Sequence, residues 1–414
     1  MIKSGDGMKK VYISDLHIGD GKGKDDFSFD SELIEFIDQL IDVGCDELII
    51  AGDGLELLNS SVVMSLELSP FVPDTANVSR ALLESIVTQH EDVFQAFRRF
   101  SKKGRIVYVI GNHDYYLLFD DNLRKQLKEV LGGSERVSVL PYYFDPEMRI
   151  LTLHGNQFDA VNRLSVDTKS KRILMPFSEY MSRYMFEHFD SNLLRINAPE
   201  HILKDYHNVS PILDVFKWFQ YIRDFYDLEF DLMDLWNKSF VKMLKTDFSK
   251  AWLKANYPYM RVFTGLFVNR YGGMKIGERI VRFVMDIRTV KRTDYLFKSA
   301  KKFLGAFRDN GFKSIMDSRY FVGFQELPKV VPSEISGCIM GHNHRSSLRI
   351  VHVDGEKKFY ANPGTWKPVV EAIDGSNGKA FEKRIELGYV IVEKEGNGFH
   401  IEARQVRKLN DVKL

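Results

Sequence analysis

Cysteine is scarce in this sequence: two residues, Cys45 and Cys338, occur among 414. Small domains that depend on disulfides carry many more, so a disulfide framework is excluded as the basis of the fold. Both cysteines lie in apolar stretches, 43–50 and 335–340, that are typical of buried strands. We therefore expect two buried thiols and a reducing compartment.

Long hydrophobic runs and a net charge are also lacking. No stretch approaches the roughly 18 uncharged apolar residues of a transmembrane helix, and residues 1–10 lack the apolar core of a signal peptide. The formal net charge of +1 excludes a uniformly basic nucleic-acid coat or a long acidic tail. These absences predict a globular, cytoplasmic protein.

The first 160 residues alternate short apolar runs with helical patterns, which is typical of an α/β domain with a largely parallel sheet. Amphipathic spacing predicts helices at 33–41 and 87–100. The apolar runs predict strands at 11–14, 47–51, 105–110 and 149–153. Strand signals return after Pro332, at 336–340, 348–353, 357–361, 387–393 and 399–403.

Residues 161–333 differ in composition from the rest of the chain, since they hold 31 of the 53 aromatic residues. Helical spacing runs from Ile212 to Trp236 and again from Glu278 to Phe307, with Gly311 as the expected helix end. Between residues 235 and 335 there are 20 Lys and Arg against 8 Asp and Glu. The aromatic residues suit a helical core or an apolar slot, and the basic surplus suits a solvated face or a binding patch.

The predicted organisation is therefore an α/β domain built from 1–160 and 334–414, interrupted by a helical, aromatic- and Lys/Arg-rich insertion at 161–333. Residues 19–26 read as a flexible polar loop.

Five polar clusters each follow a predicted strand directly. They are Asp15-Leu-His17, Gly52-Asp53-Gly-Leu-Glu56, Gly111-Asn112-His113-Asp114, His154-Gly155 and Gly341-His342-Asn343-His344. The carboxyl ends of strands in an open α/β sheet lie along one edge, where binding sites form. The glycines allow sharp turns and a close approach of the backbone. We therefore expect all five clusters to meet at one rim.

The residue types of these clusters are those of a metal site. Carboxylate, imidazole and amide ligands without thiolate suit Mn²⁺, Fe or Zn²⁺. If the Asp15–His17 and His342–His344 segments are extended, alternate side chains point the same way and can reach one ion. Asp53 at a strand end is placed to bridge two cations about 3.5–4 Å apart, which would activate a water molecule for phosphoester hydrolysis.

Each cluster alone has an ordinary explanation. Asp15 can cap a helix, Asp53 can be a turn residue, and isolated histidines are commonly structural or exposed. The recurrence of such residues after five strands favours a metal site over five coincidences. Glu56 is interpreted as a partner of the metal ligands rather than as an exposed loop acid.

The five clusters, in this order, resemble the motifs of the calcineurin-like metallophosphoesterases over about 240 residues outside the insertion. The resemblance implies a sandwich of two mixed β-sheets flanked by helices. It implies that Asp15, His17, Asp53 and His344 hold one metal ion and that Asp53, Asn112, His154 and His342 hold the other. It also implies that His113 is the general acid, oriented by Asp114.

Within that family, the stretches ISDLHIGDG, GDGLELL, HGNQFD and YANPGTW are most similar to the UDP-2,3-diacylglucosamine pyrophosphatase group. Glu56 fits the group. His113 stands where the group typically has Arg, Ser346 stands where Pro is usual, and the insertion is larger than the group's cap.

The expected function is two-metal hydrolysis, most simply with Mn²⁺, of a phosphodiester or a pyrophosphate such as a nucleotide-diphosphate lipid. A DNA or RNA nuclease of the same superfamily is the alternative, and a non-catalytic metal-binding scaffold is an alternative of another class. The expected partner is a phosphate-containing substrate. From the basic insertion we also expect peripheral contact with a membrane or an anionic polymer.

Overall fold

The computed structural model describes residues 8–22, 25–133, 135–195, 205–210, 214–257, 292–305, 321–323, 335–353, 355–376, 378–396 and 398–413. The expected helical pattern from Glu278 to Ile287, its end at Gly311, Ile212 and residues 23–24 of the polar loop lie outside these ranges. Among the described helices, none combines the length and apolarity that crossing a bilayer requires.

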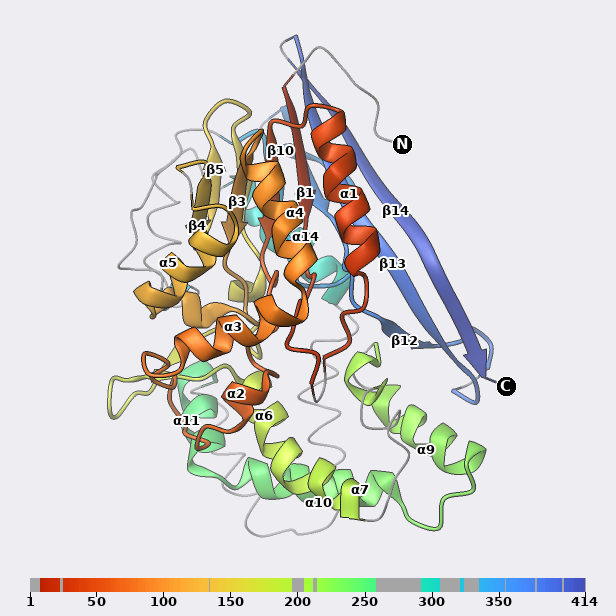
Figure 1. The fold of residues 1–414 in the computed structure, drawn as a ribbon. Helices are drawn as coiled ribbons and strands as arrows, with labels where there is room; N and C mark the ends of the chain where they lie inside the picture. Colours follow the sequence, from red (N-terminus) through yellow and green to blue (C-terminus); the bar gives the residue numbers. More distant parts are fainter. Residues whose placement is uncertain are drawn as a thin grey trace.

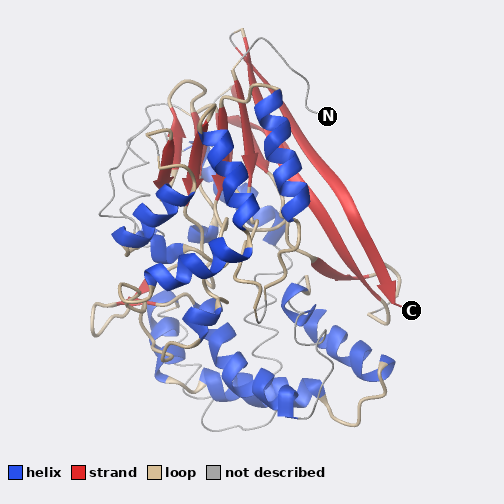
Figure 2. Cartoon of the chain, in the orientation of Figure 1, coloured by secondary structure: helices blue, strands red, loops and turns tan. Residues whose placement is uncertain are grey.

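Two mixed sheets form the body of the protein, as expected from the sequence (Figures 1 and 2). In the larger sheet β1 to β4 run parallel, while β13 pairs antiparallel with β1, β12 and β14. The order is β12(Val369–Ala372), β13(Phe381–Glu395), β1(Lys9–Ile13), β2(Glu47–Ala51), β3(Arg105–Val109), β4(Val137–Leu140), with β14(Gly398–Lys413) on β13.

The second sheet has a parallel centre and antiparallel edges. Its order is β10(Ser347–Val353), β11(Glu356–Asn362), β9(Gly337–Ile339), β6(Ile150–Thr152), β5(Tyr143–Asp145). Alternation along β1 explains how the layers pack, because Val11 and Ile13 join the cluster beneath the helices while Tyr12 faces the interior between the sheets. Cys45 and Cys338 are buried and unpaired, as predicted.

Helices cover the outer face of the larger sheet (Figure 1). They are α1(Asp30–Asp42), α3(Ser79–Gln89), α4(Glu91–Ser101) and α5(Asp121–Val130), with the short α2(Ser61–Met64) in a loop. The amphipathic stretch predicted as one helix at 87–100 is divided between α3 and α4 at His90, whose φ of −123° and ψ of 40° are not helical.

The insertion is largely helical where it is described. Its elements are the short hairpin β7(Ser165–Val166) and β8(Ile173–Leu174), then α6(Phe177–Met185), the π-helix η3(Phe186–Asp190), α7(Ser191–Arg195), the 3₁₀ turn η4(Tyr206–Asn208), α9(Val215–Phe225), α10(Leu232–Leu244), α11(Asp247–Asn256) and α14(Arg292–Gly305). Aromatic side chains of α6, α9, α10 and α11 form a second core, in which Trp236 stacks on Phe240 and Tyr180 on Phe248. This core also includes Val370 of β12 and Phe381 of β13.

Helix α14 behaves differently from the rest of the insertion. Leu296, Ala300 and Leu304 are buried in the same cluster as the residues beneath α1 and α4. Phe297 contacts the ring of Tyr360 on β11. The helix therefore packs against the second sheet. The division at residues 161 and 333 remains a proposal.

Candidate metal centre

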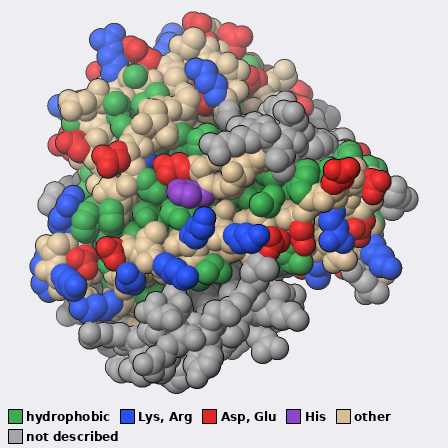
Figure 3. Space-filling model, turned by 90° about the horizontal axis from the view of Figure 1, so that it is seen from below, with side chains coloured by type: hydrophobic (Ala, Val, Ile, Leu, Met, Phe, Trp, Pro, Cys, Tyr) green, Lys and Arg blue, Asp and Glu red, His purple; other side chains and the backbone are tan. Residues whose placement is uncertain are grey.

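The candidate ligands come from loops that follow β1, β2, β3, β6 and β9, so strands of both sheets direct their carboxyl ends to one site. Backbone bonds hold the first two loops together: Asp15 N–H donates to Gly52 O at 3.1 Å and His17 N–H donates to Asp53 O at 3.0 Å. Thr365, after β11, donates its hydroxyl to Asp15 O at 2.9 Å. In Figure 3, a histidine and acidic side chains lie near the middle of the face seen from below, beside Lys and Arg side chains.

The backbone at the site is left-handed, which corrects the expectation of extended segments. Asp15 and His17 have φ of 54° and 53°, Asp53 has 52°, and His342 and His344 have 72° and 58°. This conformation costs about 1–2 kcal/mol for each non-glycine residue, although Asp and His tolerate it better than most. Side chains therefore converge because the chain turns at each ligand, and not because alternate residues of a strand share a face.

Two glycines are required by close packing at the centre. A Cβ on Gly52 would lie 2.3 Å from His154 Nδ1, and a Cβ on Gly111 would lie 2.1 Å from Asp53 Oδ1. The strand-end glycines thus leave room for the next loop's ligand.

Asp15, His17 and His344 form one group whose ligand atoms lie within 4.8 Å of one another. His344 Nε2 lies 3.3 Å from Asp15 Oδ1, and His17 Nε2 lies 3.4 Å from His344 Nε2. His17 Nδ1 lies 3.0 Å from Glu56 Oε2 and donates its proton there, so the lone pair of Nε2 faces the group. A cation between these nitrogens and the carboxylate satisfies all three.

Asp15, Asp53 and His154 form the second group. His154 Nε2 lies 3.0 Å from Asp53 Oδ2 and 3.1 Å from Asn112 Oδ1. Because His154 Nδ1 donates to Ala51 O at 3.0 Å, its Nε2 is likewise directed at the acidic groups. His154 and both carboxylates are buried. Asp15 thus belongs to both groups, and Asp53 is close to each.

The electrostatics of the second group fit a cation. Burial lowers the pKa of His154, but Asp53 and Asp15 outweigh it and raise that pKa to about 10. Burial raises the pKa of Asp53, yet the neighbouring histidines, His154 first, hold it well below the ordinary value. A proton on His154 therefore supplies the positive charge that a divalent ion would bring to the same place.

His342 is placed less directly than the other expected ligands. Its backbone N–H donates to Asp15 Oδ2 at 3.0 Å, and its ring lies 5.2 Å from the ring of His154. Its Nε2 lies 3.3 Å from Asp159 Oδ2. Asp159, within the HGNQFD stretch, was not singled out by the sequence, although a carboxylate behind a ligand histidine is a common arrangement.

His113 lies at the edge of the centre. Its Nδ1 is 2.8 Å from Glu56 Oε1, its ring meets that of His17 edge-on at 4.5 Å, and its N–H donates to Asp53 Oδ1 at 2.7 Å. Burial lowers the pKa of His113, but the charges of Glu56 and Asp53 outweigh it and raise that pKa overall. His17, Asp53 and His113 also qualify as a ligand group by distance.

The expected orientation of His113 by Asp114 is corrected by these contacts. The Asp114 carboxylate accepts from Gly111 N–H at 2.5 Å, from Gly54 N–H at 3.1 Å and from the Tyr108 hydroxyl. It therefore holds the backbone of two ligand loops. The carboxylate that contacts the His113 ring is Glu56, which also contacts His17.

Lys367 is a further cation beside the centre. It is half-buried, it follows the YANPGTW stretch, and its charge lowers the pKa of His17 and of His113. Its N–H donates to the Thr365 hydroxyl, which in turn donates to Asp15 O. In the sequence, the only signal for Lys367 was that it directly follows the YANPGTW stretch.

Comparison with known proteins gives one family match. Residues 8–177 match the family model of the calcineurin-like phosphoesterases. No curated protein matches the chain. Among solved structures, a dimetal phosphatase from Danio rerio is similar at 11% identity, over 97% of this chain and 99% of that one, with a TM-score of 0.30. A similarity at that score carries no argument about the site.

Proposed function

Because residues 8–177 match the family model of the calcineurin-like phosphoesterases, we propose that this chain is a metal-dependent phosphoesterase that hydrolyses a phosphodiester or pyrophosphate bond with two divalent ions. One observation carries the proposal. Asp53 Oδ2 lies 3.0 Å from His154 Nε2 and 4.0 Å from His17 Nε2, so a single carboxylate oxygen stands between two imidazole groups. A carboxylate so placed suits a bridge between two cations.

The proposed ligands of one ion are Asp15, His17, Asp53 and His344. Those of the other are Asp53, Asn112, His154 and His342. Carboxylate, imidazole and amide donors favour Mn²⁺, with Fe or Zn²⁺ as alternatives. Two such ions, when bound, supply an activated water molecule and neutralise charge on the phosphate.

The residues of the chain provide the rest of the reaction. We assign His113 the transfer of a proton to the leaving oxygen, because its ring is at the edge of the centre and Glu56 favours its protonated form. Asp114 holds the loops of Asp53 and Asn112 in position by accepting hydrogen bonds from the backbone N–H groups of Gly54 and Gly111. Lys367 is placed to attract the phosphate charge.

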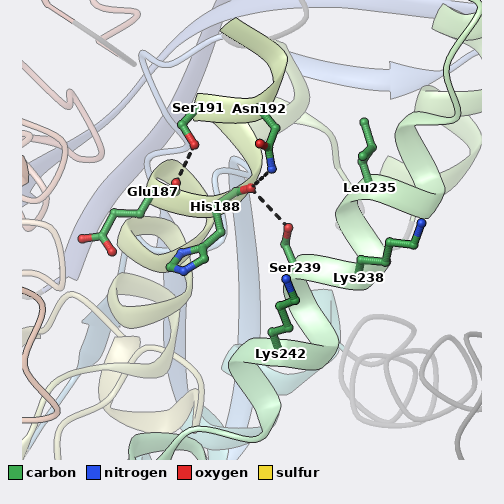
Figure 4. Close-up of a pocket in the computed structure, with 8 residues that line it drawn as sticks. All are labelled: Glu187, His188, Ser191, Asn192, Leu235, Lys238, Ser239 and Lys242. Carbon is green, nitrogen blue, oxygen red and sulfur yellow. Dashed lines mark hydrogen bonds between the residues drawn. The ribbon is translucent and has the colours of Figure 1, made fainter. Parts of the chain in front are cut away.

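The proposed substrate carries an apolar or nucleotide portion, as a nucleotide-diphosphate lipid does, and the insertion would recognise that portion. A cavity of about 280 Å³ lies between the η3–α7 segment and α10 (Figure 4). The residues that line it are Glu187, His188, Ser191, Asn192, Leu235, Lys238, Ser239 and Lys242. Two lysines at the cavity suit an anionic group of a substrate, a membrane or an anionic polymer.

A nuclease is the second candidate. It is favoured by lysines of the basic stretch along α10 and α11, of which Lys238, Lys242, Lys245 and Lys250 are exposed and Lys254 is half-buried. Cations along a surface can follow a nucleic-acid backbone, with a steep dependence on salt.

A hydrolysis screen with Mn²⁺ tests these proposals. It should cover UDP-sugar lipids, nucleotide diesters, phosphomonoesters, and single- and double-stranded DNA. Preference for the lipid or nucleotide pyrophosphates supports the first proposal, and preference for DNA supports the nuclease. Failure on every class with two ions bound, confirmed by elemental analysis, would contradict both.

A further inference from the structure

A buried carboxylate of the insertion contacts the residues that follow His113. Glu179, on α6, is 1% exposed and accepts a hydrogen bond from the Tyr115 hydroxyl at 2.6 Å and another from the Tyr116 hydroxyl. These tyrosines, also 1% exposed, begin the 3₁₀ turn η1(Tyr115–Leu118), directly after Asp114. A side chain from outside the predicted catalytic core therefore holds the loop that carries His113.

An apolar side chain would fill this buried space at a lower cost in free energy than the Glu179 carboxylate does. A buried carboxylate loses hydration worth several kcal/mol, which its partners must offset. Arg183, one turn along α6, is only a distant partner, since its Nη1 lies 3.8 Å from Glu179 Oε1. Burial raises the pKa of Glu179, and the two tyrosine hydroxyls oppose that rise. Directional bonds to two adjacent residues set the position of that turn, which an apolar side chain could not do.

Helix α6 also reaches the second loop at the site. The Ser182 hydroxyl donates to Asn59 Oδ1 at 3.3 Å, and Asn59 N–H donates to Glu56 Oε1 at 3.3 Å. Arg183 Nη2 donates to Leu66 O at 2.7 Å, beyond α2. Since Glu56 contacts the His113 ring, one helix is connected to His113 along two routes.

We infer that Glu179 is a positioning residue for His113, which makes α6 a part of the catalytic assembly and not only of a substrate cap. The inference rests on the proposed function, because His113 is proposed there as the proton donor. His113 and Tyr116 belong to a stretch of only four residues, 113–116. A displacement near 1 Å at a reacting group can cost about 100-fold in rate.

The kinetic test uses Glu179→Ala, Glu179→Gln and the Tyr115→Phe/Tyr116→Phe double variant. Glu179→Ala should retain both metal ions by elemental analysis and should lower kcat about 10- to 100-fold on substrates with poor leaving groups, with KM little changed. Activated aryl phosphates should lose less. Glu179→Gln should retain most activity, since the amide keeps one acceptor and adds a donor. Glu229→Gln, an exposed change elsewhere in the insertion and outside the cavity, is the matched control.

A double-mutant cycle separates positioning from general damage. In the Tyr115→Phe/Tyr116→Phe background, Glu179→Ala should add no further loss of kcat, because the bonds through which it acts are already absent. Losses that multiply, losses equal for both leaving-group types, or an unchanged kcat would overturn the inference. If Glu179→Ala does not fold, the tyrosine double variant must show the same selective loss of kcat.

A measurement that does not depend on turnover distinguishes failure of this inference from failure of the proposed function. The ring signals of His113 and His188 can be assigned by NMR in the protein loaded with diamagnetic Zn²⁺, with the help of His113→Gln and His188→Gln. Glu179→Ala and the tyrosine variant should shift the His113 signals and leave those of His188 in place. Unmoved His113 signals would overturn the inference whether or not the protein hydrolyses any substrate.

Discussion

His344 Nε2 lies 3.3 Å from Asp15 Oδ1, although 329 positions of sequence separate the two residues. Asp15 follows β1 of the larger sheet, and His344 follows β9 of the second sheet. The site is therefore complete only when both sheets are in place. Metal binding and packing of the two sheets should be thermodynamically linked, because the folded chain holds the ligands together and the unfolded chain does not.

The first prediction concerns metal dependence. The chain should bind two divalent ions, chelation should abolish activity, and Mn²⁺ should restore it best. Because of the linkage above, metal should also raise the melting temperature, since one site at a hundredfold excess of free ion over Kd adds about 2.7 kcal/mol to the free energy of unfolding. Calorimetry with and without Mn²⁺ measures this shift.

Asp53→Asn tests the same site by substitution. It should remove most activity, since a bridging ligand needs its full negative charge. The exposed Asp38→Asn is the control, because Asp38 pairs with Arg99 on the surface of α1 and α4. Full turnover in a preparation shown by elemental analysis to be metal-free would refute the two-metal mechanism.

A second prediction separates proton transfer from metal binding. His113→Gln should keep both ions, because the proposed ligand set does not include this residue. Its rate on substrates with poor leaving groups should fall roughly 10²–10⁴-fold. Aryl phosphates with acidic leaving groups need little protonation and should lose less. Equal losses on the two kinds of substrate, or loss of an ion, would show that His113 does not act as the acid.

The third prediction is a change of pH profile in Glu56→Gln. His113 must be protonated to act, so kcat should fall as pH rises through its pKa. Burial lowers that pKa while Glu56 and Asp53 raise it, and only Glu56 remains unengaged when Asp53 bridges two ions. Removing the Glu56 charge should therefore move the alkaline limb of the kcat profile to lower pH.

The same variant should bind metal about 10- to 100-fold more weakly, since His17 loses the partner of its Nδ1. Glu91→Gln, exposed on α4, is the control for loss of one negative charge. An alkaline limb at the wild-type position would argue that Glu56 does not govern His113.

The α/β class and the meeting of five loops could be predicted because both depend on local signals, whereas the sandwich of two sheets was implied by the resemblance to the metallophosphoesterases. Short apolar runs followed by Gly and a polar ligand mark the strand ends, and strands 47–51 and 105–110 appear as β2 and β3 almost unchanged. β4 and β5 were missed because their residues, in Val137–Leu140 and Tyr143–Asp145, are few and only partly apolar. β13 begins earlier than predicted, since its first residues carry charges paired across the sheet, as in Arg384 with Glu371.

The contacts of individual side chains at the site could not be predicted from the order of the residues in the sequence. Asp114 is adjacent to His113 in sequence, yet its carboxylate points to Gly111 and Gly54, and Glu56 from another loop contacts the ring. The directions of the proposed ligands Asp15, His17, Asp53, His342 and His344 depend on left-handed φ angles, which no residue pattern in the sequence indicates. Glu179 lies in an ordinary amphipathic helix, so nothing local marks its contact with Tyr115.

A fourth prediction concerns stability and pH. Lys10 Nζ lies 3.0 Å from Glu47 Oε2 and 2.6 Å from Asp145 Oδ2, with all three side chains buried, and so joins β1 and β2 to β5 of the other sheet. Lys10→Met should lower the free energy of unfolding at pH 7 by about 3–5 kcal/mol, because the buried Asp145 carboxylate loses its cation and Glu47 keeps only its pair with Arg105. Denaturant titration measures the difference.

That difference should depend on pH in a defined direction. Burial lowers the pKa of Lys10, but Glu47 and Asp145 raise it above the ordinary 10.5. Since the folded pKa is the higher one, the stabilisation is fully present below 10.5 and is lost as pH rises through the folded value. As pH rises, wild type and Lys10→Met should therefore converge only above pH 10.5. Lys394→Met, which breaks an exposed pair with Glu147, should cost less than about 1 kcal/mol.

The last prediction asks whether the insertion selects the substrate. Deleting residues 161–333 would not answer this, because Glu179 and the buried residues of α14 would be lost with it. Charge reversal at the cavity is a sharper change. Figure 4 shows Lys238 and Lys242 on α10 among the residues that line the cavity, and both are exposed. Lys238→Glu/Lys242→Glu should leave folding and a small chromogenic diester unaffected.

For a large substrate with an anionic or amphipathic group, the same variant should lower kcat/KM about 30-fold, if each cation contributes about 1 kcal/mol. The loss should shrink with added salt, most steeply for a nucleic acid. Lys169→Glu/Lys217→Glu, a change of two exposed lysines of the insertion that lie outside both the cavity and the basic stretch, should have little effect. Equal discrimination between large and small substrates in wild type and the cavity variant would place substrate choice elsewhere, in loops such as 19–26 or at Lys367.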